Sequence, residues 1–192
     1  LEEIGVPYEL IESTKDRTKP RPPEQMAINP NGWLPVLKWE DSAIYECAAI
    51  TVFLCDRHPD AGLAPALDDP TRGLYLQTLV YFSNSVQNAF QLNYYPDRFA
   101  DTPEGEPSAQ RRGIRRLRET WSLINDQIGD NRWMLGERFS ALDIYLFMLS
   151  TWLSAEYGHP DLGQFSNVKR ISDKVMQRPS AAKAYPALIG AA

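Results

Sequence analysis

Residues 29–37 of the chain read NPNGWLPVL, and this stretch decides how the first part of the protein folds. The apolar run at 34–39 is typical of a strand. Pro35 belongs at the opening of that strand, because proline has no N–H to donate to a neighbouring strand. Residues 40–42 (EDS) indicate a turn, so residues 43–45 can return antiparallel. The stretch therefore predicts a strand that opens on a proline, with a second short strand beside it.

The next segment, residues 45–50 (YECAAI), leads into a helix. Residues 46–57 repeat apolar side chains at helical spacing, and Pro59 ends the pattern. Glu46 and Cys47 therefore fall at a helix N-terminus, where free N–H groups and the helix dipole favour a carboxylate. The apolar residues of this predicted helix are Ile50, Phe53 and Leu54.

The chain divides into two predicted domains, residues 1–67 and 68–192. In the first domain, the alternating segment at 6–12 (VPYELIE) predicts another strand. Residues 13–32 are polar and rich in proline and turn formers, so a weak helix and a loop are equally compatible with them. The tract at 62–70 (GLAPALDDP) has no periodic pattern and is typical of an interdomain linker.

Everything after the linker is predicted to be helical. One long helix spans 71–93, and a second helix with one apolar face spans 108–128. A row of arginines lies opposite that apolar face. Such a face is usually solvated, and a contribution to an anion site or a subunit interface is the alternative. The apolar face contains Ile114, Leu117, Trp121, Ile124 and Ile128, and the charged face contains Arg111, Arg112, Arg115, Arg116 and Arg118.

Residues 139–144 (FSALDI) carry the clearest local signal, a helix capping box. The Ser140 side chain can accept a hydrogen bond from the Asp143 N–H, while the Asp143 carboxylate accepts from the Ser140 N–H. Phe139 and Ile144 stand at the hydrophobic-staple positions. The helix that follows, residues 144–153, is apolar all round and is expected at the centre of the helical domain. Ser140 and Asp143 are therefore predicted to be structural residues.

Composition excludes several classes of protein. The 192 residues have a net charge of −5 and a pI near 5.1, which argues against binding of nucleic acid through its phosphates. Two histidines far apart indicate no metal site. Cys47 and Cys55 lie eight residues apart on one predicted helix, about 12 Å, which is too far for a disulfide.

The uncharged stretch at 73–96 holds six amide side chains, so no membrane span is predicted. No nucleotide-binding, zinc-protease or serine-hydrolase motif occurs.

Three separated stretches resemble the glutathione transferase superfamily, in its bacterial cytosolic form. Residues 29–37 are similar to the family's N-P-x-G loop and V/L-P-x-L strand opening, and residues 45–54 to its E-S-x-A-I helix start. Residues 135–143 (LGERFSALD) resemble L-G-x-x-F-S-x-A-D, and Arg178-Pro179 is a further match. The resemblance implies a thioredoxin-like α/β N-terminal domain followed by an all-α helical-bundle domain.

The resemblance also implies glutathione as a cosubstrate, held by Leu34, Pro35, Glu46 and Cys47. Relatives have a cis bond before the strand-opening proline, so the Leu34–Pro35 bond is expected to be cis, with the Leu34 backbone turned outward. The cysteinyl backbone of glutathione would lie along Leu34, its γ-glutamyl carboxylate on the Cys47 N–H and its amino group near Glu46. Taken alone, Pro35 and Glu46 are equally well explained as an edge-strand proline and a simple helix-start acid.

The sequence departs from the family pattern at two places. Relatives usually carry serine at the Cys47 position, and a thiol is a weaker hydrogen-bond donor. A cysteine at a helix N-terminus also tends toward a lowered pKa, which leaves a redox role open beside simple packing.

The second departure concerns residues 1–8 (LEEIGVPY), which are similar to the end of the family's first helix. The family's first strand and its thiol-activating residue would precede Leu1, so no catalytic residue is assigned. A sheet without that strand would leave two unpaired edges, so we expect the polypeptide to begin about twenty residues earlier. A rearranged first domain, or a strand supplied by another chain, is the alternative.

These features predict an enzyme that stabilises the glutathione thiolate and lets it attack a small hydrophobic electrophile. A thiol-disulfide reductase, a reductive dehalogenase, an ether-cleaving lyase and an isomerase stay open within the same fold, and a non-catalytic binding or assembly module is the second hypothesis. The resemblance implies a cytoplasmic homodimer. The electrophile pocket is expected along the long uncharged helix and the turn after it, with plain packing as the alternative for each residue: Tyr81, Asn84, Asn88, Tyr94 and Tyr95.

Overall fold

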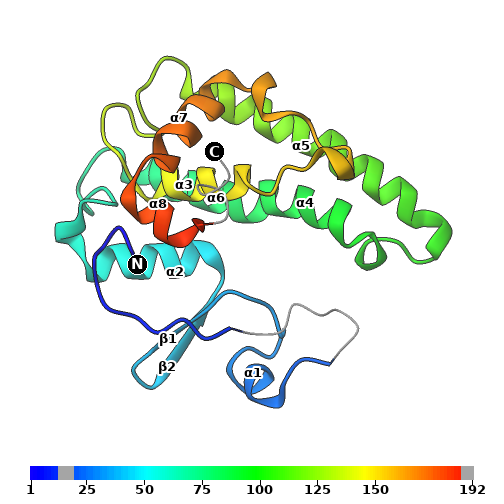
Figure 1. The fold of residues 1–192 in the computed structure, drawn as a ribbon, viewed down its shortest axis with the longest axis horizontal. Helices are drawn as coiled ribbons and strands as arrows, with labels where there is room; N and C mark the ends of the chain where they lie inside the picture. The colour runs from blue at the N-terminus through cyan, green and yellow to red at the C-terminus, as the bar shows by residue number, and fades with distance from the viewer. Residues whose placement is uncertain (13–19, 187–192) are drawn as a thin grey trace.

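The computed structural model describes residues 1–12 and 20–186, which form a small α/β part and a larger helical part (Figure 1). The α/β part contains α1 (Pro23–Ile28), β1 (Val36–Trp39), β2 (Ser42–Tyr45) and α2 (Cys47–Arg57). The helical part contains α3 (Arg72–Tyr81), α4 (Gln87–Tyr94), α5 (Glu106–Ile128), α6 (Ala141–Ser150), α7 (Ser166–Met176) and α8 (Pro179–Ala184). Short 3₁₀ turns lie at Pro59–Ala61, Pro96–Arg98, Pro103–Gly105, Ala155–Tyr157 and Leu162–Gln164.

Strands β1 and β2 form the predicted antiparallel hairpin. Val36 pairs with Tyr45 and Trp39 pairs with Ser42, and Glu40 in the connecting turn has a φ of 51°. The strand begins at Val36 and not at residue 34, because Pro35 has no N–H for the ladder. The Leu34–Pro35 bond is cis, as the resemblance implied.

Residues 6–12 do not form the predicted strand. They have no regular secondary structure, and most of their side chains are exposed. The reason is pairing: a strand needs a hydrogen-bonded neighbour, and within the described ranges the sheet contains β1 and β2 alone. Alternating side chains do not supply that neighbour. Of the segment predicted as helix or loop, residues 13–19 lie outside the described residues, and α1 occupies part of the remainder.

Helix α2 forms where the periodicity predicted it and lies between the hairpin and the helical part (Figure 1). On the hairpin side, Phe53 packs edge-to-face on Trp39, with ring centroids 5.3 Å apart. On the other side, Cys55 is buried in the main core with side chains of the helical part. Two faces of one helix therefore join the two parts of the molecule.

The long helix predicted over 71–93 forms with one interruption. Helices α3 and α4 are joined by a π-helical segment, Phe82–Val86, in which the Gln87 N–H donates to the Phe82 carbonyl. The sequence does not indicate this segment, because buried apolar residues continue at three- and four-residue spacing through it. A π turn is wider than an α turn, so it changes where the side chains after it point.

Helix α5 begins at Glu106, two residues before the predicted start, and packs along α4. Gly113 permits this close approach, because a Cβ there would lie 2.9 Å from both the Ala89 carbonyl oxygen and the Asn93 nitrogen. The arginine face is mainly exposed, which agrees with the prediction that this face is solvated. The apolar face is buried at Leu117, Trp121, Ile124 and Ile128, and partly buried at Ile114.

The predicted capping box forms at the start of α6, which is mostly buried at the centre of the helical part. The Asp143 carboxylate accepts from the Ser140 N–H at 2.8 Å, and the Ser140 hydroxyl also accepts from the Leu142 N–H at 3.3 Å. The second Asp143 oxygen accepts from the Met134 N–H at 2.8 Å, a contact that the sequence did not indicate. Although α6 is apolar all round, no helix in residues 1–12 and 20–186 is long and apolar enough to cross a membrane.

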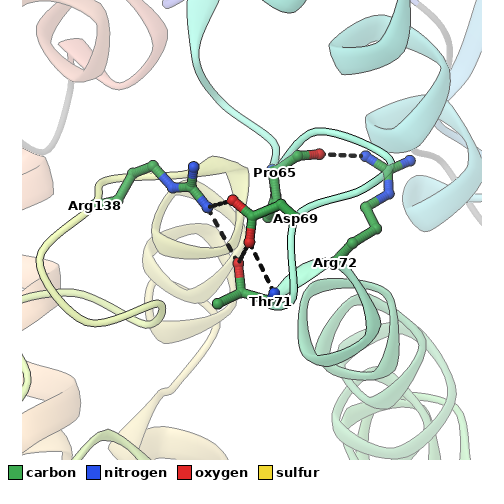
Figure 2. Close-up of polar contacts among 5 residues, drawn as sticks. All are labelled: Pro65, Asp69, Thr71, Arg72 and Arg138. Atoms are coloured by element: carbon green, nitrogen blue, oxygen red, sulfur yellow. Dashed lines mark hydrogen bonds and ion pairs between the residues drawn. The ribbon is translucent and has the colours of Figure 1, made fainter.

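The segment predicted as a linker, residues 62–70, is fastened to the helical part (Figure 2). Arg138 donates to the Asp69 carboxylate at 2.9 Å and to the Thr71 hydroxyl at 3.1 Å. Asp69 also accepts from the Thr71 N–H and hydroxyl, and these bonds together with the Arg138 bond lower the pKa of Asp69 to about 2. Side-chain hydrogen bonds at Asp69 therefore hold the C-terminal end of this connection to the helical part.

Candidate functional site

The open end of the hairpin brings the four predicted glutathione-contacting residues together. Val36 pairs with Tyr45, so Leu34–Pro35 and Glu46–Cys47 leave the hairpin side by side. Facing residues of antiparallel strands lie about 4.5–5.5 Å apart. Leu34 is 51% exposed, and neither its N–H nor its carbonyl has a partner among the described residues. This edge therefore offers one free donor and one free acceptor.

Glu46 joins β2 to α2 in a backbone conformation that is rare for a residue with a side chain, with a φ of 74°. Such a conformation costs about 1–3 kcal/mol and clusters at functional sites. The Glu46 side chain is exposed, and no side chain caps the N-terminus of α2. The first-turn N–H groups of α2 are therefore available to an anion.

Cys47 is the first residue of α2, as predicted, but its thiol faces the helical part. Gln87 Nε2 donates to the Cys47 sulfur at 3.8 Å, and the Tyr145 hydroxyl donates to Gln87 Oε1 at 2.6 Å. Burial raises the pKa of the Cys47 thiol, and the hydrogen bond from Gln87 offsets this only in part. The expected lowering of this pKa is wrong, because loss of water around the thiol outweighs the helix N-terminus. Both cysteines are free thiols, as predicted.

Pro35 and Cys47 also line an apolar cavity of about 410 Å³ between α2, α6, α8 and the first residues of the chain. Tyr145 forms part of the same wall. Leu34 and Glu46 do not line the cavity, and both are exposed. The site thus has an apolar inner side and a polar outer edge.

The five residues predicted for the electrophile pocket do not converge on one place. Tyr81 and Tyr95 are 14 residues apart on a nearly continuous helix, which is about 21 Å. Tyr94 is engaged in packing, because its hydroxyl donates to the Trp152 carbonyl at 2.6 Å and its ring contacts several aromatic side chains. Asn84 and Asn88 are exposed. None of the five lines the 410 Å³ cavity.

Tyr95 is connected to the glutathione-contacting edge through Arg98, a contact that the sequence did not indicate. The Arg98 guanidinium lies 4.3 Å from the centre of the Tyr95 ring and 5.3 Å from the centre of the Trp33 ring. Trp33 immediately precedes Leu34, so the contact joins the end of α4 to the predicted glutathione loop. Gln87, Tyr145 and Arg98 had no motif to mark them, because their partners come from distant parts of the chain.

Ser140 and Asp143 lie in the capping box of α6 and do not line the 410 Å³ cavity. Burial raises the pKa of Asp143 to about 6, although hydrogen bonds from Met134 and Ser140 act in the opposite direction. Within the described residues, no group of three or more histidine, cysteine, aspartate or glutamate side chains is arranged to hold a metal ion.

Comparison with known proteins identifies the family. Residues 1–57 match the N-terminal domain of glutathione S-transferases, and residues 107–174 match their C-terminal domain. The chain belongs to the glutathione S-transferase superfamily. The thioredoxin-like domain and the helical domain implied by the sequence motifs are therefore the two domains of a glutathione S-transferase, and the resemblance is confirmed.

Several glutathione S-transferases cover most of this chain at modest identity. The uncharacterized GST-like protein YncG of Escherichia coli strain K12 is 29% identical over 153 residues, 79% of this chain and 72% of YncG. Glutathione S-transferase GstA of Escherichia coli O157:H7 is 26% identical over 165 residues, 85% of this chain and 78% of GstA. A glutathione S-transferase of Methylobacterium radiotolerans, solved as a crystal structure in complex with glutathione sulfonate, is 27% identical in sequence to this chain. The two structures superpose with a TM-score of 0.76 over 95% of this chain and 84% of the Methylobacterium chain.

Proposed function

We propose that this glutathione S-transferase binds glutathione at the open end of the β1–β2 hairpin and promotes attack of its thiolate on a small hydrophobic electrophile. The observation that carries the proposal is the hairpin register, which sets the unpaired backbone of Leu34 beside Glu46 and the N-terminus of α2. A tripeptide with a free backbone amide, an amino group and a carboxylate complements these groups. The glutathione sulfonate complex of the Methylobacterium relative supports the same ligand class.

In the proposed complex, the cysteinyl backbone of glutathione pairs with the Leu34 backbone beside Pro35, as an added strand would. The γ-glutamyl carboxylate accepts from the first-turn N–H groups of α2, beginning with Cys47. The amino group lies against the Glu46 carboxylate in a charge-assisted hydrogen bond. The proposal assigns no described residue to activation of the glutathione thiol.

The electrophile is proposed to lie at the C-terminal end of α4, near Tyr95. The contact of Arg98 with both Tyr95 and Trp33 supports this placement, because it sets that end of the helix next to the loop before Leu34. Asn88 lies two turns before Tyr95 on the same helix, whereas Tyr81 is about 21 Å away along it.

Calorimetric titration of the protein with glutathione tests the binding site. Glu46→Gln removes the charge proposed to meet the amino group, and we expect it to weaken binding about tenfold. Glu40→Gln is the matched control, since Glu40 is also an exposed glutamate with positive φ, at the other end of β2. Its affinity should stay within about twofold of wild type. No heat from the wild-type protein, or equal losses in the two variants, would contradict the proposal.

Turnover separates the enzyme from a non-catalytic module. We expect the protein to accelerate conjugation of glutathione with a halogenated dinitrobenzene, followed by absorbance. Glutathione binding without any acceleration would instead support the binding or assembly module.

We also propose that the protein forms a homodimer through an apolar groove of about 560 Å³ between α2 and α3. Leu76 and Val80 of α3 are 38% and 58% exposed beside Phe53 of α2, which leaves an apolar face without a partner among the described residues. Val80→Glu should yield a monomer by light scattering with unchanged circular dichroism. Leu123→Glu, at a 51% exposed site on α5, should leave the mass unchanged.

A further inference from the structure

A small polar cluster lies where the proposed glutathione site meets the helical part, and it consists of Cys47, Gln87 and Tyr145. Gln87 donates its amide N–H to the Cys47 sulfur at 3.8 Å, and the Tyr145 hydroxyl donates to the Gln87 carbonyl oxygen at 2.6 Å. The Tyr145 side chain also lies close enough to the Cys47 thiol to influence its pKa. Two hydrogen bonds thus connect α6 to α4 and α4 to α2 in a short chain from Tyr145 through Gln87 to Cys47.

The cluster turns the Cys47 side chain away from the exposed edge. Tyr145 is only 5% exposed and Cys47 is partly buried, so a ligand on the edge would have to displace the Gln87 amide to reach the sulfur. Cys47 can therefore serve an anion through its backbone N–H, whose position depends on how the first turn of α2 is held.

Gln87 reaches this position immediately after the π-helical segment Phe82–Val86. An α-helix turns about 100° per residue, so an inserted wide turn redirects every side chain that follows it. Among the described residues, the segment also contacts α2. The π turn and the amide together bring the start of α4 against the start of α2.

We propose that Gln87 and Tyr145 are positioning residues of the glutathione site, which act through Cys47 to fix the first turn of α2 against the helical domain. This inference rests on the proposed function. It assigns to two residues of the second domain a part in binding a ligand that they do not touch.

The other end of α2 offers a matched control. Cys55, eight residues further on, is buried beside the hydroxyl of Tyr75 on α3, and Tyr75 is fully buried. Tyr75→Phe and Tyr145→Phe each remove a buried tyrosine hydroxyl beside a cysteine of α2. The Tyr145 hydroxyl donates to Gln87, whereas the Tyr75 hydroxyl has no hydrogen-bond partner among the described residues. Only the Tyr145 contact lies at the end of the helix that is proposed to bind the ligand.

The test measures the dissociation constant of glutathione by calorimetry, together with the thermal midpoint, for each full-chain variant. We expect Tyr145→Phe and Gln87→Met to weaken glutathione binding about threefold to tenfold, equal to about 0.7–1.4 kcal/mol. Tyr75→Phe should not lower the thermal midpoint and should not change affinity by more than about twofold, because the buried Tyr75 hydroxyl has no hydrogen-bond partner among the described residues. The double variant Gln87→Met/Tyr145→Phe should have the same dissociation constant for glutathione as the single variant that binds less tightly. The two effects should not add, because both changes break the same cluster. Cys47→Ala, which removes the sulfur that Gln87 contacts, should weaken binding as much as Gln87→Met does.

The outcomes separate the two proposals. If the wild-type protein binds glutathione and the affinity of Tyr145→Phe and Gln87→Met equals that of Tyr75→Phe, the positioning role is wrong and the proposed function stands. If Tyr145→Phe fails to fold, Gln87→Met at its partly buried position decides the question alone. If the wild-type protein does not bind glutathione, the proposed function fails and this inference fails with it.

Discussion

Asp143 connects the N-terminus of α6 to the loop before it through two backbone N–H groups. Its oxygens accept from Met134 and Ser140, both at 2.8 Å, in a fully buried position. Asp143→Ala leaves both N–H groups without an acceptor, so we expect the free energy of unfolding to fall by about 2–4 kcal/mol in urea titrations. Asp173→Ala, which breaks an exposed pair with Lys169, should cost no more than about 0.5 kcal/mol. Similar losses in the two variants would contradict this role.

His159 is a buried titratable group whose ring contacts the rings of Phe90 and Tyr94 on α4. The Ser154 N–H donates to its Nδ1 at 3.1 Å, so Nε2 carries the proton and donates to Asn93 Oδ1 at 2.9 Å. Burial lowers the pKa of His159, so below about pH 6.5 the unfolded chain binds a proton that the folded protein does not. The free energy of unfolding should therefore fall as the pH drops from about 6.5 toward the lowered pKa.

This pH dependence is checked by urea unfolding at a series of pH values. His159→Gln should be less stable than wild type at pH 8 and should lose stability less steeply between pH 6.5 and the lowered pKa. The raised pKa of Asp143 changes the free energy of unfolding with pH in the opposite direction. Asp143 is present in both proteins, so its effect cancels when the two curves are subtracted. Parallel curves for the two proteins would show that His159 does not titrate in the way described.

At the scale of elements, Arg72 fixes the start of α3 to both neighbouring segments. It donates to the Pro65 carbonyl at 3.0 Å (Figure 2). It also donates to the Asp56 carboxylate of α2 at 3.0 Å, and its side chain is 11% exposed. Arg72→Met keeps the aliphatic stem and removes the donors, so we expect a loss of about 1–3 kcal/mol and faster proteolysis within residues 62–70. Arg116→Met, which breaks an exposed pair with Glu119, should change stability by less than about 0.5 kcal/mol.

At the scale of the whole molecule, one core includes side chains from both parts of the chain. Cys55 and Leu63 belong to the same buried cluster as the apolar residues of α3 to α7, and Glu3 at the start of the chain forms a two-point ion pair with Arg178 near α8, at 2.6 and 2.8 Å. Arg178 lowers the pKa of Glu3. These contacts favour unfolding of the two parts in a single transition.

The single transition is tested with Cys55 as a probe of α2. In a Cys47→Ser background, the Cys55 thiol should become reactive to a thiol reagent at the same urea concentration at which helical circular dichroism is lost. Thiol exposure at a clearly lower urea concentration would show that α2 separates from the helical part before that part unfolds.

The sequence by itself determined the elements whose cause is local. The hairpin, α2, α5 and the capping box of α6 lie where periodicity, proline positions and capping residues predicted them, because neighbouring residues in the sequence supply those interactions. The family motifs placed Leu34, Pro35, Glu46 and Cys47 together, and the hairpin register brings them side by side because the turn between β1 and β2 is short.

The tertiary structure alone decided the features whose partners come from distant segments. The predicted strand at 6–12 does not form, because pairing with another strand and not alternation makes a strand. The pKa of Cys47 is raised where the helix N-terminus predicted lowering, because α4 and α6 bury the thiol. The π turn, the Gln87–Tyr145 contact and the Arg98 contact with Trp33 follow from packing between helices and loops. The pattern of residues along one segment cannot predict such contacts, because their energy depends on where the other segment lies in the folded protein.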